Sequence, residues 1–230
     1  MLIIGHRGAG GIAPENTMAS FQAGLESAAD MLEFDVRLTK DRIPVVIHDS
    51  RLIRTHHLRE SIAGLTLEEL AELTPEQQVP TLEEVLDTYF GVILLNIELK
   101  ARGSGQVVIA LLKDRYIKKA KDWDNVIISS FKGSELLAIR RREKKANLAL
   151  LHDQNPFLFI AYQRFIQFTA VGFHRLYLNS FALEIARKAG LFIYVYTVDR
   201  PAALPLLQRQ GIDGVVTNYP DKFHAALEKE

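Results

Sequence analysis

Short β-branched segments alternate with longer helix-like segments along the whole chain, and this alternation restricts the fold more than any other feature. Such alternation is typical of βα units arranged around a parallel sheet, so the chain belongs to the α/β class. Segments with the composition of strands are residues 2–5, 31–38, 43–48, 93–99, 126–130, 147–151, 175–178, 192–198 and 213–217. Segments with helical periodicity are residues 17–29, 66–73, 81–89, 104–121, 133–145, 156–167, 181–189 and 201–210.

One of these strands is surplus to an eight-stranded barrel. Residues 31–38 and 43–48 are joined by residues 39–42 alone, which is too short for a parallel crossover but suits a hairpin. We therefore expect residues 43–48 to form an extra antiparallel strand after the second barrel strand. The other strands then close a TIM (β/α)₈ barrel, and the hairpin brings His48 close to Glu33 and Asp35.

Length and composition favour a single ordinary globular domain. The chain has 230 residues, a length that α/β barrels commonly use as one domain, and residues 1–230 contain no repeat or linker. The formal net charge is zero, so no overall field attracts nucleic acid or an anionic membrane. There is no cysteine, which excludes disulfides, thiolate metal sites and thiol nucleophiles. The N-terminus does not resemble a signal peptide, so we expect a cytoplasmic protein.

Three carboxylates are expected to meet at one end of the barrel. Glu33 and Asp35 lie two residues apart on a strand and share one face, and Glu98 shares a face with Lys100 on another strand. Carboxylates at the C-terminal ends of barrel strands repel one another unless a hard cation binds them, and all-oxygen ligation favours Mg²⁺ or Ca²⁺. The alternative is a buried salt-bridge network, in which Glu98 pairs with Lys100 and Glu33 with Arg7.

Two histidines flank this predicted metal site. His6 ends the first strand and His48 ends the hairpin strand, which suits a general acid and a general base because imidazole titrates near neutral pH. Arg7 and Lys100 supply positive charge, and a guanidinium recognises phosphate oxygens well. The combination predicts phosphoryl transfer to water.

These segments resemble the glycerophosphodiester phosphodiesterase family. The likeness begins with HRGAGGIAPENT at residues 6–17 and continues with EFDV at 33–36, VVIHD at 45–49, NIELK at 96–100 and DGVVTNYP at 213–220. It covers essentially the whole chain. The resemblance implies a TIM barrel that hydrolyses small glycerophosphodiesters to glycerol 3-phosphate and an alcohol. It assigns metal binding to Glu33, Asp35 and Glu98, acid–base catalysis to His6 and His48, and phosphate contacts to Arg7 and Lys100.

Other residues at strand ends are candidates for the substrate pocket. Tyr196 stands near the end of the seventh barrel strand, where many family members have tryptophan, so it keeps an aromatic surface and adds a hydroxyl. Ser130, with Phe131 beside it, ends the fourth barrel strand and is a candidate substrate contact. His152 follows the fifth barrel strand and is a weaker candidate, whereas the adjacent loop residues His56 and His57 are expected to face solvent.

Residues 156–173 are unusually aromatic and have two interpretations. They form either a barrel helix with its following strand, packed in the core, or an exposed surface for a lipid, an apolar substrate group or a second subunit of a homodimer. Polar residues interrupt the stretch too often for it to span a bilayer. The second interpretation keeps open a lysophospholipase D or a cyclising phospholipase-like activity. A non-catalytic phosphodiester-binding barrel is a further alternative, although every catalytic position is present.

Overall fold

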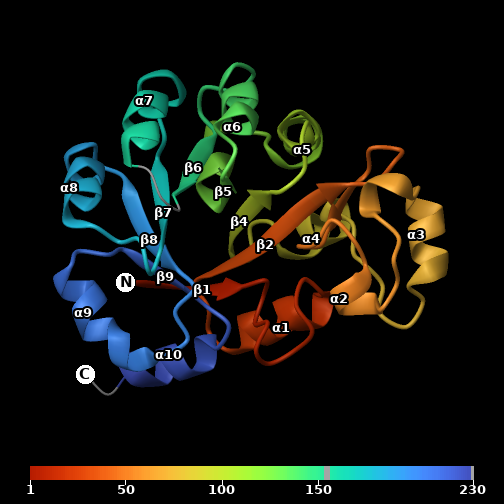
Figure 1. Ribbon diagram of the computed structural model, residues 1–230, viewed down its shortest axis with the longest axis horizontal. Helices are drawn as coiled ribbons and strands as arrows, with labels where there is room; N and C mark the ends of the chain where they lie inside the picture. The colour runs from red at the N-terminus through yellow and green to blue at the C-terminus, as the bar shows by residue number, and fades with distance from the viewer. Residues whose placement is uncertain (153–155, 229–230) are drawn as a thin grey trace.

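Eight parallel strands close into a barrel, and a ninth strand pairs with it from outside (Figure 1). The computed structural model describes residues 1–152 and 156–228. Its strands are β1 (Leu2–His6), β2 (Met31–Leu38), β3 (Pro44–Val46), β4 (Leu94–Leu99), β5 (Val126–Ser130), β6 (Asn147–His152), β7 (Ala170–His174), β8 (Phe192–Tyr196) and β9 (Gly214–Thr217). The sheet closes because β1 pairs with both β2 and β9 in parallel. The predicted TIM barrel is confirmed.

Helices cover the outside of the barrel between successive strands (Figure 1). The α-helices are α1 (Met18–Glu26), α2 (Ile53–His56), α3 (Leu67–Leu73), α4 (Leu82–Tyr89), α5 (Ser104–Leu111), α6 (Gly133–Arg140), α7 (Pro156–Ile166), α8 (Ser180–Lys188), α9 (Leu204–Arg209) and α10 (Pro220–Leu227). Shorter helical turns are η1 (Ile62–Gly64), η2 (Leu112–Tyr116), η3 (Ala120–Asn125) and η4 (Pro201–Ala203). The sequence predicted neither α10 nor the short α2 and η1.

The hairpin after the second barrel strand has the expected antiparallel pairing. Val36 faces Val46 and Leu38 faces Pro44 across β2 and β3. The pairing continues beyond β3, where the Ile47 amide donates to the Asp35 carbonyl over 2.9 Å. His48 is therefore carried to the same end of the barrel as Asp35.

The sixth barrel strand does not lie where the sequence predicted it. We expected residues 175–178, but β7 comprises Ala170–His174. Gly172 weakens the strand pattern, yet the barrel needs glycine there because an added Cβ would lie 2.6 Å from the Tyr194 ring and 2.7 Å from Leu151. The correction places His174, and not residue 178, at the C-terminal end of this strand.

Two predicted helices are shorter than expected, and several helix ends have favourable caps. Residues 104–121 divide into α5 and η2 with an irregular end, and α6 stops at Arg140. Thr17 caps α1, and Thr81 forms a capping box with Glu84 at the start of α4. Gly190 has a φ of +66° directly after α8, as expected for a helix stop.

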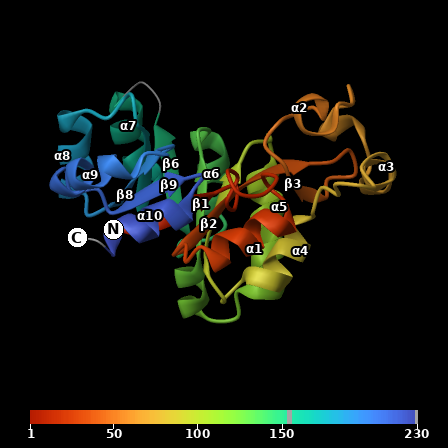
Figure 2. The ribbon, with the colours of Figure 1, turned by 90° about the horizontal axis from the view of Figure 1, so that it is seen from below.

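Three apolar clusters of the described residues stabilise the barrel, its surrounding helices and the insertion after β3. The largest fills the space between the barrel and its helices, and a smaller one fills the barrel interior around Ile4, Ala149 and Tyr194. A third cluster belongs to the insertion after β3 and includes Ile47, Leu52, Ile62 and Leu70. Figure 2 shows this insertion, with α2 and α3, at one end of the molecule and far from α7, α8 and α9.

Most of the aromatic segment 156–173 belongs to the core. Phe159, Phe168 and Phe173 are buried, whereas Phe165 at the end of α7 is 69% exposed. The side chain of Phe157 lies outside the described residues. Within the described part of the chain, no helix is long and apolar enough to cross a membrane. The core interpretation therefore accounts for Phe159, Phe168 and Phe173, but not for the exposed ring of Phe165.

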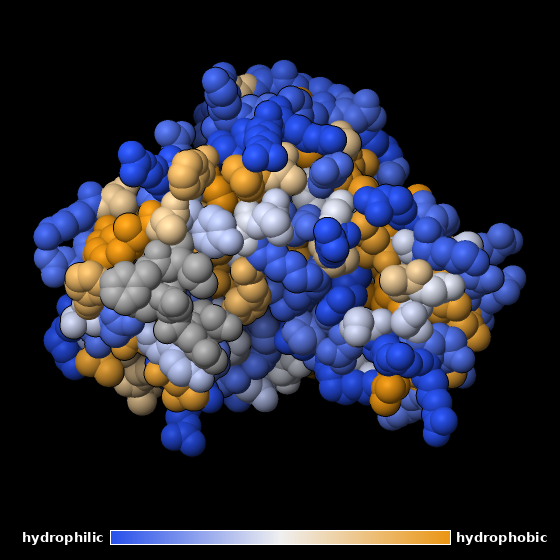
Figure 3. Space-filling model, turned by 45° about the horizontal axis from the view of Figure 1, so that its top comes forward, coloured by the Kyte–Doolittle hydropathy of each residue, from blue (hydrophilic) through white to orange (hydrophobic). Residues whose placement is uncertain are grey.

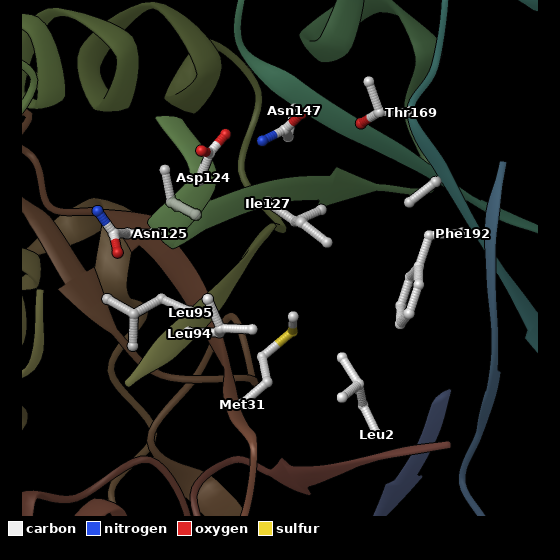
Figure 4. A pocket seen from close by; sticks show the side chains of 12 residues that line it. Leu2, Met31, Leu94, Leu95, Asp124, Asn125, Ile127, Asn147, Thr169 and Phe192 are labelled. Carbon is white, nitrogen blue, oxygen red and sulfur yellow. The ribbon is translucent and has the colours of Figure 1, made fainter. Parts of the chain in front are cut away.

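The N-terminal end of the barrel contains an apolar hollow of about 270 Å³. Figure 4 shows Met31, Leu94, Ile127 and Phe192 around it, with Asn125 and Asn147 at its edge. The charged strand ends described below lie at the opposite, C-terminal end of the strands. Barrel enzymes place their active sites at that opposite end, so this hollow is not the candidate site.

Candidate active site

The end of β1 positions the first two candidate residues in a constrained turn. Arg7 has a φ of +54°, and Gly8 follows with a φ of +86°. A side chain at Gly8 would lie 2.5 Å from the backbone of Ser20, and the Ser20 hydroxyl donates to the Arg7 carbonyl over 2.8 Å. Only glycine fits this contact without strain, which explains the glycine that follows His6-Arg7.

Three buried carboxylates meet at the C-terminal ends of β2 and β4. Each of Glu33, Asp35 and Glu98 offers an oxygen within 4.8 Å of an oxygen of the others, a spacing that suits a shared metal ion. The Arg7 amide donates to Glu33 Oε2 over 2.9 Å, whereas the buried Glu33 Oε1 accepts no hydrogen bond from any residue that the structure describes. A buried carboxylate oxygen without a donor is costly, and a cation is the ordinary remedy.

Asp35 is the centre of this group of charges. Its Oδ2 accepts from Asn16 Nδ2 over 2.9 Å and lies 3.3 Å from Arg7 Nε, and its Oδ1 lies 3.2 Å from Lys100 Nζ. Burial alone would raise the pKa of Asp35, but Lys100 and Arg7 outweigh it and lower that pKa to about 2. Asp35 is therefore permanently ionised at neutral pH.

The pKa values of Glu33 and Glu98 are raised, in contrast to that of Asp35. Burial, reinforced by the charge of Asp35, raises the pKa of Glu33 to about 8 and that of Glu98 to about 8. Lys100 forms an ion pair with Glu98 but does not reverse the shift. Without a cation this carboxylate group therefore retains protons near neutral pH, and a bound cation would displace them.

His6 is held by a chain of hydrogen bonds from the end of β9. Its Nδ1 lies 2.7 Å from Asn218 Oδ1. The Asn218 amide is oriented by Asp199, whose carboxylate accepts from Asn218 Nδ2 over 2.9 Å and also from the hydroxyl of Thr217. Asn218 therefore accepts the Nδ1 proton of His6, and His6 Nε2 faces the carboxylates, 4.0 Å from Glu33. Burial lowers the pKa of His6.

His48 is held by a carboxylate instead. Its Nδ1 lies 2.7 Å from Asp49 Oδ1, and Asp49 Oδ2 accepts from Arg54 Nε over 2.7 Å. Arg54 also donates to both carboxylate oxygens of Glu15, which in turn accepts from Arg7 Nη1 over 2.8 Å. One network thus ties the inserted loop, His48 and Arg7 together.

The comparisons with known proteins agree with this geometry. The profile of the glycerophosphoryl diester phosphodiesterase family matches residues 6–222, which include every residue of the site. The chain belongs to this family. The expectation of a phosphodiesterase enzyme is thereby confirmed.

Several family members cover nearly the full chain. A putative glycerophosphodiester phosphodiesterase of Bacillus subtilis is 36% identical over 96% of both chains, and one from Caldanaerobacter subterraneus is 32% identical over 99% of this chain and 98% of its own. Among solved structures, a glycerophosphodiester phosphodiesterase from Thermotoga maritima has a TM-score of 0.84 at 30% identity, covering 98% of this chain and 97% of its own. An Oleispira antarctica phosphodiesterase, solved with its product sn-glycerol-3-phosphate, has a TM-score of 0.86 at 26% identity, covering 99% and 97%.

The other rim candidates occupy different positions in this family member. Tyr196 lies at the barrel mouth, and its hydroxyl donates to the His152 carbonyl over 3.3 Å. Ser130 is fully buried. Its hydroxyl donates to the Leu99 carbonyl and accepts from the Lys132 amide. The structure therefore does not bring the Ser130 hydroxyl to the mouth.

The remaining histidine candidates lie away from the three carboxylates. His152 is buried beside Phe173, with ring centroids 5.2 Å apart. His56 contacts the Thr55 hydroxyl and the Gln77 carbonyl, and His57 is exposed. The prediction that these histidines face solvent is confirmed for His57, whereas His56 is half-buried.

Sequence reasoning did not single out three residues that shape this family site. Asn16 was considered as a helix cap, but its side chain instead holds both the carboxylate and the backbone amide of Asp35. Asn218 follows β9 directly, and that position at a strand end was the available signal. Arg54 gave no signal, because its partner Glu15 is 39 residues away in the sequence.

Proposed function

We propose that this chain hydrolyses glycerophosphodiesters to glycerol 3-phosphate and an alcohol, with a divalent cation bound by Glu33, Asp35 and Glu98. The observation that carries the proposal is the buried group of three carboxylates faced by Arg7 and Lys100. When ionised, the carboxylates outnumber the two cationic side chains by one. A divalent ion would leave one positive charge, which matches a singly charged phosphodiester.

The donor set fits a hard cation. All three side chains offer oxygen, which favours Mg²⁺ or Ca²⁺, and Glu33 Oε1 has no hydrogen-bond partner within residues 1–152 and 156–228. When bound, such an ion would neutralise the non-bridging phosphate oxygens and stabilise the charge that develops during hydrolysis. Arg7 and Lys100 would add to this through direct contact with the same oxygens.

The two histidines would move the protons, and their partners differ in a way that suggests separate roles. His6 is oriented by the neutral amide of Asn218, so its Nε2 is available to take a proton from the nucleophile. His48 is oriented by the carboxylate of Asp49, which stabilises an imidazolium, so His48 suits the protonation of the departing oxygen. We assign His6 as the base and His48 as the acid on this ground.

An activity panel tests the proposal. The enzyme is stripped of metal and assayed with glycerophosphocholine and Mg²⁺, Ca²⁺ or Mn²⁺, and phosphorus NMR identifies the product. Release of glycerol 3-phosphate with at least one cation supports the proposal. A cyclic phosphate as the final product would favour the cyclising phospholipase-like activity, and strong preference for a long-chain lysophospholipid would favour lysophospholipase D. The single-domain organisation, the cytoplasmic location and the homodimer remain predictions.

A further inference from the structure

A continuous row of aromatic rings leads away from the phosphate-binding lysine. Lys100 Nζ lies 5.6 Å from the centre of the Phe131 ring, and Phe131 packs edge-on against Tyr196 with centroids 6.0 Å apart. Tyr196 contacts His174 at 5.7 Å, and His174 contacts Tyr177 at 5.3 Å. We call Phe131, Tyr196, His174 and Tyr177 the aromatic row.

The strand order places this row across the barrel mouth from the metal ligands. Glu33, Asp35 and Glu98 come from β2 and β4, whereas the middle of the row comes from β7 and β8 on the opposite side of the closed sheet. Phe131 follows β5 and joins the two sides. A substrate whose phosphate lies beside Lys100 can therefore extend its alcohol along the row.

The row and its neighbours are unusually exposed for apolar side chains. Phe131 is 42% exposed and Tyr177 is 44% exposed, and the adjacent Leu176 and Phe181 are 72% and 53% exposed. Figure 3 shows apolar patches on the side of the molecule where α7 and α8 lie. Single exposed apolar residues are common, but a connected series that starts at a catalytic site is a typical feature of a binding surface.

Two of the polar atoms inside the row are already engaged. The Tyr196 hydroxyl donates to the His152 carbonyl, and His174 Nδ1 accepts from the Leu176 amide over 3.3 Å. The row therefore offers mainly ring faces and edges, which suit hydrocarbon better than a polyol. A cationic head group on Phe131 would meet the charge of Lys100 over the same ring. An uncharged alkyl group meets no such repulsion.

We propose that the aromatic row is the subsite for the alcohol of the diester and that it takes an uncharged alkyl chain. The proposal rests on the proposed function, because it deepens the identity of the substrate at that same site. It makes the preferred substrates glycerophosphodiesters of alkyl alcohols, with small cationic or polyhydroxylated alcohols bound more weakly.

A homologous series of substrates tests the subsite. The values of kcat/KM are measured for the glycerophosphodiesters of butanol, hexanol and octanol and for glycerophosphocholine, all below their aggregation concentrations. Full burial of one methylene changes an equilibrium constant about fourfold, so a half-exposed row should give about twofold per methylene. We expect the octyl diester to exceed the butyl diester by about 10-fold to 20-fold, and both to exceed glycerophosphocholine.

Variants locate the effect on the row. Tyr177→Ser and Leu176→Ser are expected to lower the ratio of octyl to butyl kcat/KM by about fourfold. The matched control is Phe165→Ser, which removes a more exposed aromatic ring from the end of α7 and should leave the ratio unchanged. A loss of the chain-length effect in the control alone, or in none of the variants, would contradict the assignment to the row.

Direct binding separates this proposal from the proposed function. The affinities of butyl, hexyl and octyl phosphate for the metal-loaded enzyme are measured by calorimetry, which needs no turnover. Affinity that rises with chain length while no diester is hydrolysed would support the row and refute the proposed function. Turnover with the same kcat/KM and the same affinity for every chain length would refute the row and leave the proposed function intact.

Discussion

His6 Nδ1 lies 2.7 Å from the side-chain oxygen of Asn218, a residue 212 positions later in the chain. The two meet because β1 and β9 are adjacent in the closed barrel, with Gly5 opposite Thr217. Asp199 fixes which end of the Asn218 amide faces the histidine. The barrel closure thus sets the tautomer of a residue that the proposed mechanism uses for proton transfer.

Removal of the Asn218 side chain should therefore reduce catalysis more than binding. For Asn218→Ala we expect kcat to fall about 10-fold to 100-fold with little change in KM, because His6 loses its preferred tautomer and orientation. Asn218→Asp keeps an acceptor at the same place and should retain most of the activity. Nitrogen NMR of His6 should show a mixed tautomer only in the alanine variant. Wild-type kcat in that variant would show that Asn218 does not position His6.

Arg54 should matter for activity although it adds little stability. The side chain is 50% exposed and pairs with both Glu15 and Asp49, which hold Arg7 and His48 in turn. We expect Arg54→Met to lower kcat/KM about tenfold and to change the unfolding free energy by less than about 1 kcal/mol, because solvent screens exposed ion pairs. Arg51→Met, in the same loop, is the control and should have no effect on kcat/KM. Equal kinetics for the two variants would show that the network is not used.

The metal-free enzyme should lose stability as pH rises from 6.5 to 8. Glu33 and Glu98 have a pKa of about 8 in the fold against an ordinary 4.5, so the folded state holds protons that the unfolded state has lost. Asp35 does not titrate in this window, because its pKa is about 2. The pKa values of His6 and His48 are lowered in the fold, so their contribution to stability rises slightly above pH 6.5, but the larger shifts of the two glutamates outweigh it.

Thermal unfolding in chelator measures this effect. The Tm should fall between pH 6.5 and 8, and saturating Mg²⁺ or Ca²⁺ should raise the Tm more at pH 8 than at pH 6.5. Glu98→Gln removes one of the two titrating groups and should reduce the fall. A Tm that rises over this range in chelator would contradict the assigned direction of both glutamate pKa values.

Truncation of one aromatic residue on α7 should affect stability without affecting kinetics. Phe159 is buried against Phe168, with ring centroids 6.0 Å apart, so Phe159→Ala should cost about 3–5 kcal/mol. Phe165→Ala, on the same helix but exposed, should change the unfolding free energy by no more than about 0.5 kcal/mol. Denaturant unfolding and kcat/KM are measured for both. A large loss of activity at unchanged stability in Phe159→Ala would indicate that α7 contributes to substrate binding.

The barrel and most of its site could be predicted because their signals are local. Glu33 and Asp35 share a face of one strand, and the five residues between β2 and β3 permit only a hairpin, so short-range geometry brings His48 to them. The position of β7 could not be predicted in this way. Gly172 has no strand propensity of its own, and its role appears only when Tyr194 fills the space beside it.

The site residues that were predicted have local sequence signals, whereas those that were missed depend on contacts that only the fold makes. Asn16, Arg54 and Asn218 act through partners that only the closed barrel or the inserted loop brings near. Ser130 ends a barrel strand, as Tyr196 at the barrel mouth does. Its hydroxyl bonds to the neighbouring backbone instead, and the alternation of faces along β5 turns such a side chain away from the barrel interior.

The measurement that tests the central claim most directly is glycerophosphocholine hydrolysis by the wild-type enzyme and Glu33→Gln, each with divalent cation and with excess chelator. Glu33 belongs to the three carboxylates proposed to bind the cation, and one of its buried oxygens has no hydrogen-bond partner in the described part of the chain. We predict that wild-type release of glycerol 3-phosphate depends on the cation, and that Glu33→Gln is at least about 100-fold slower with cation present. Full hydrolysis by Glu33→Gln in excess chelator would contradict the metal-dependent account.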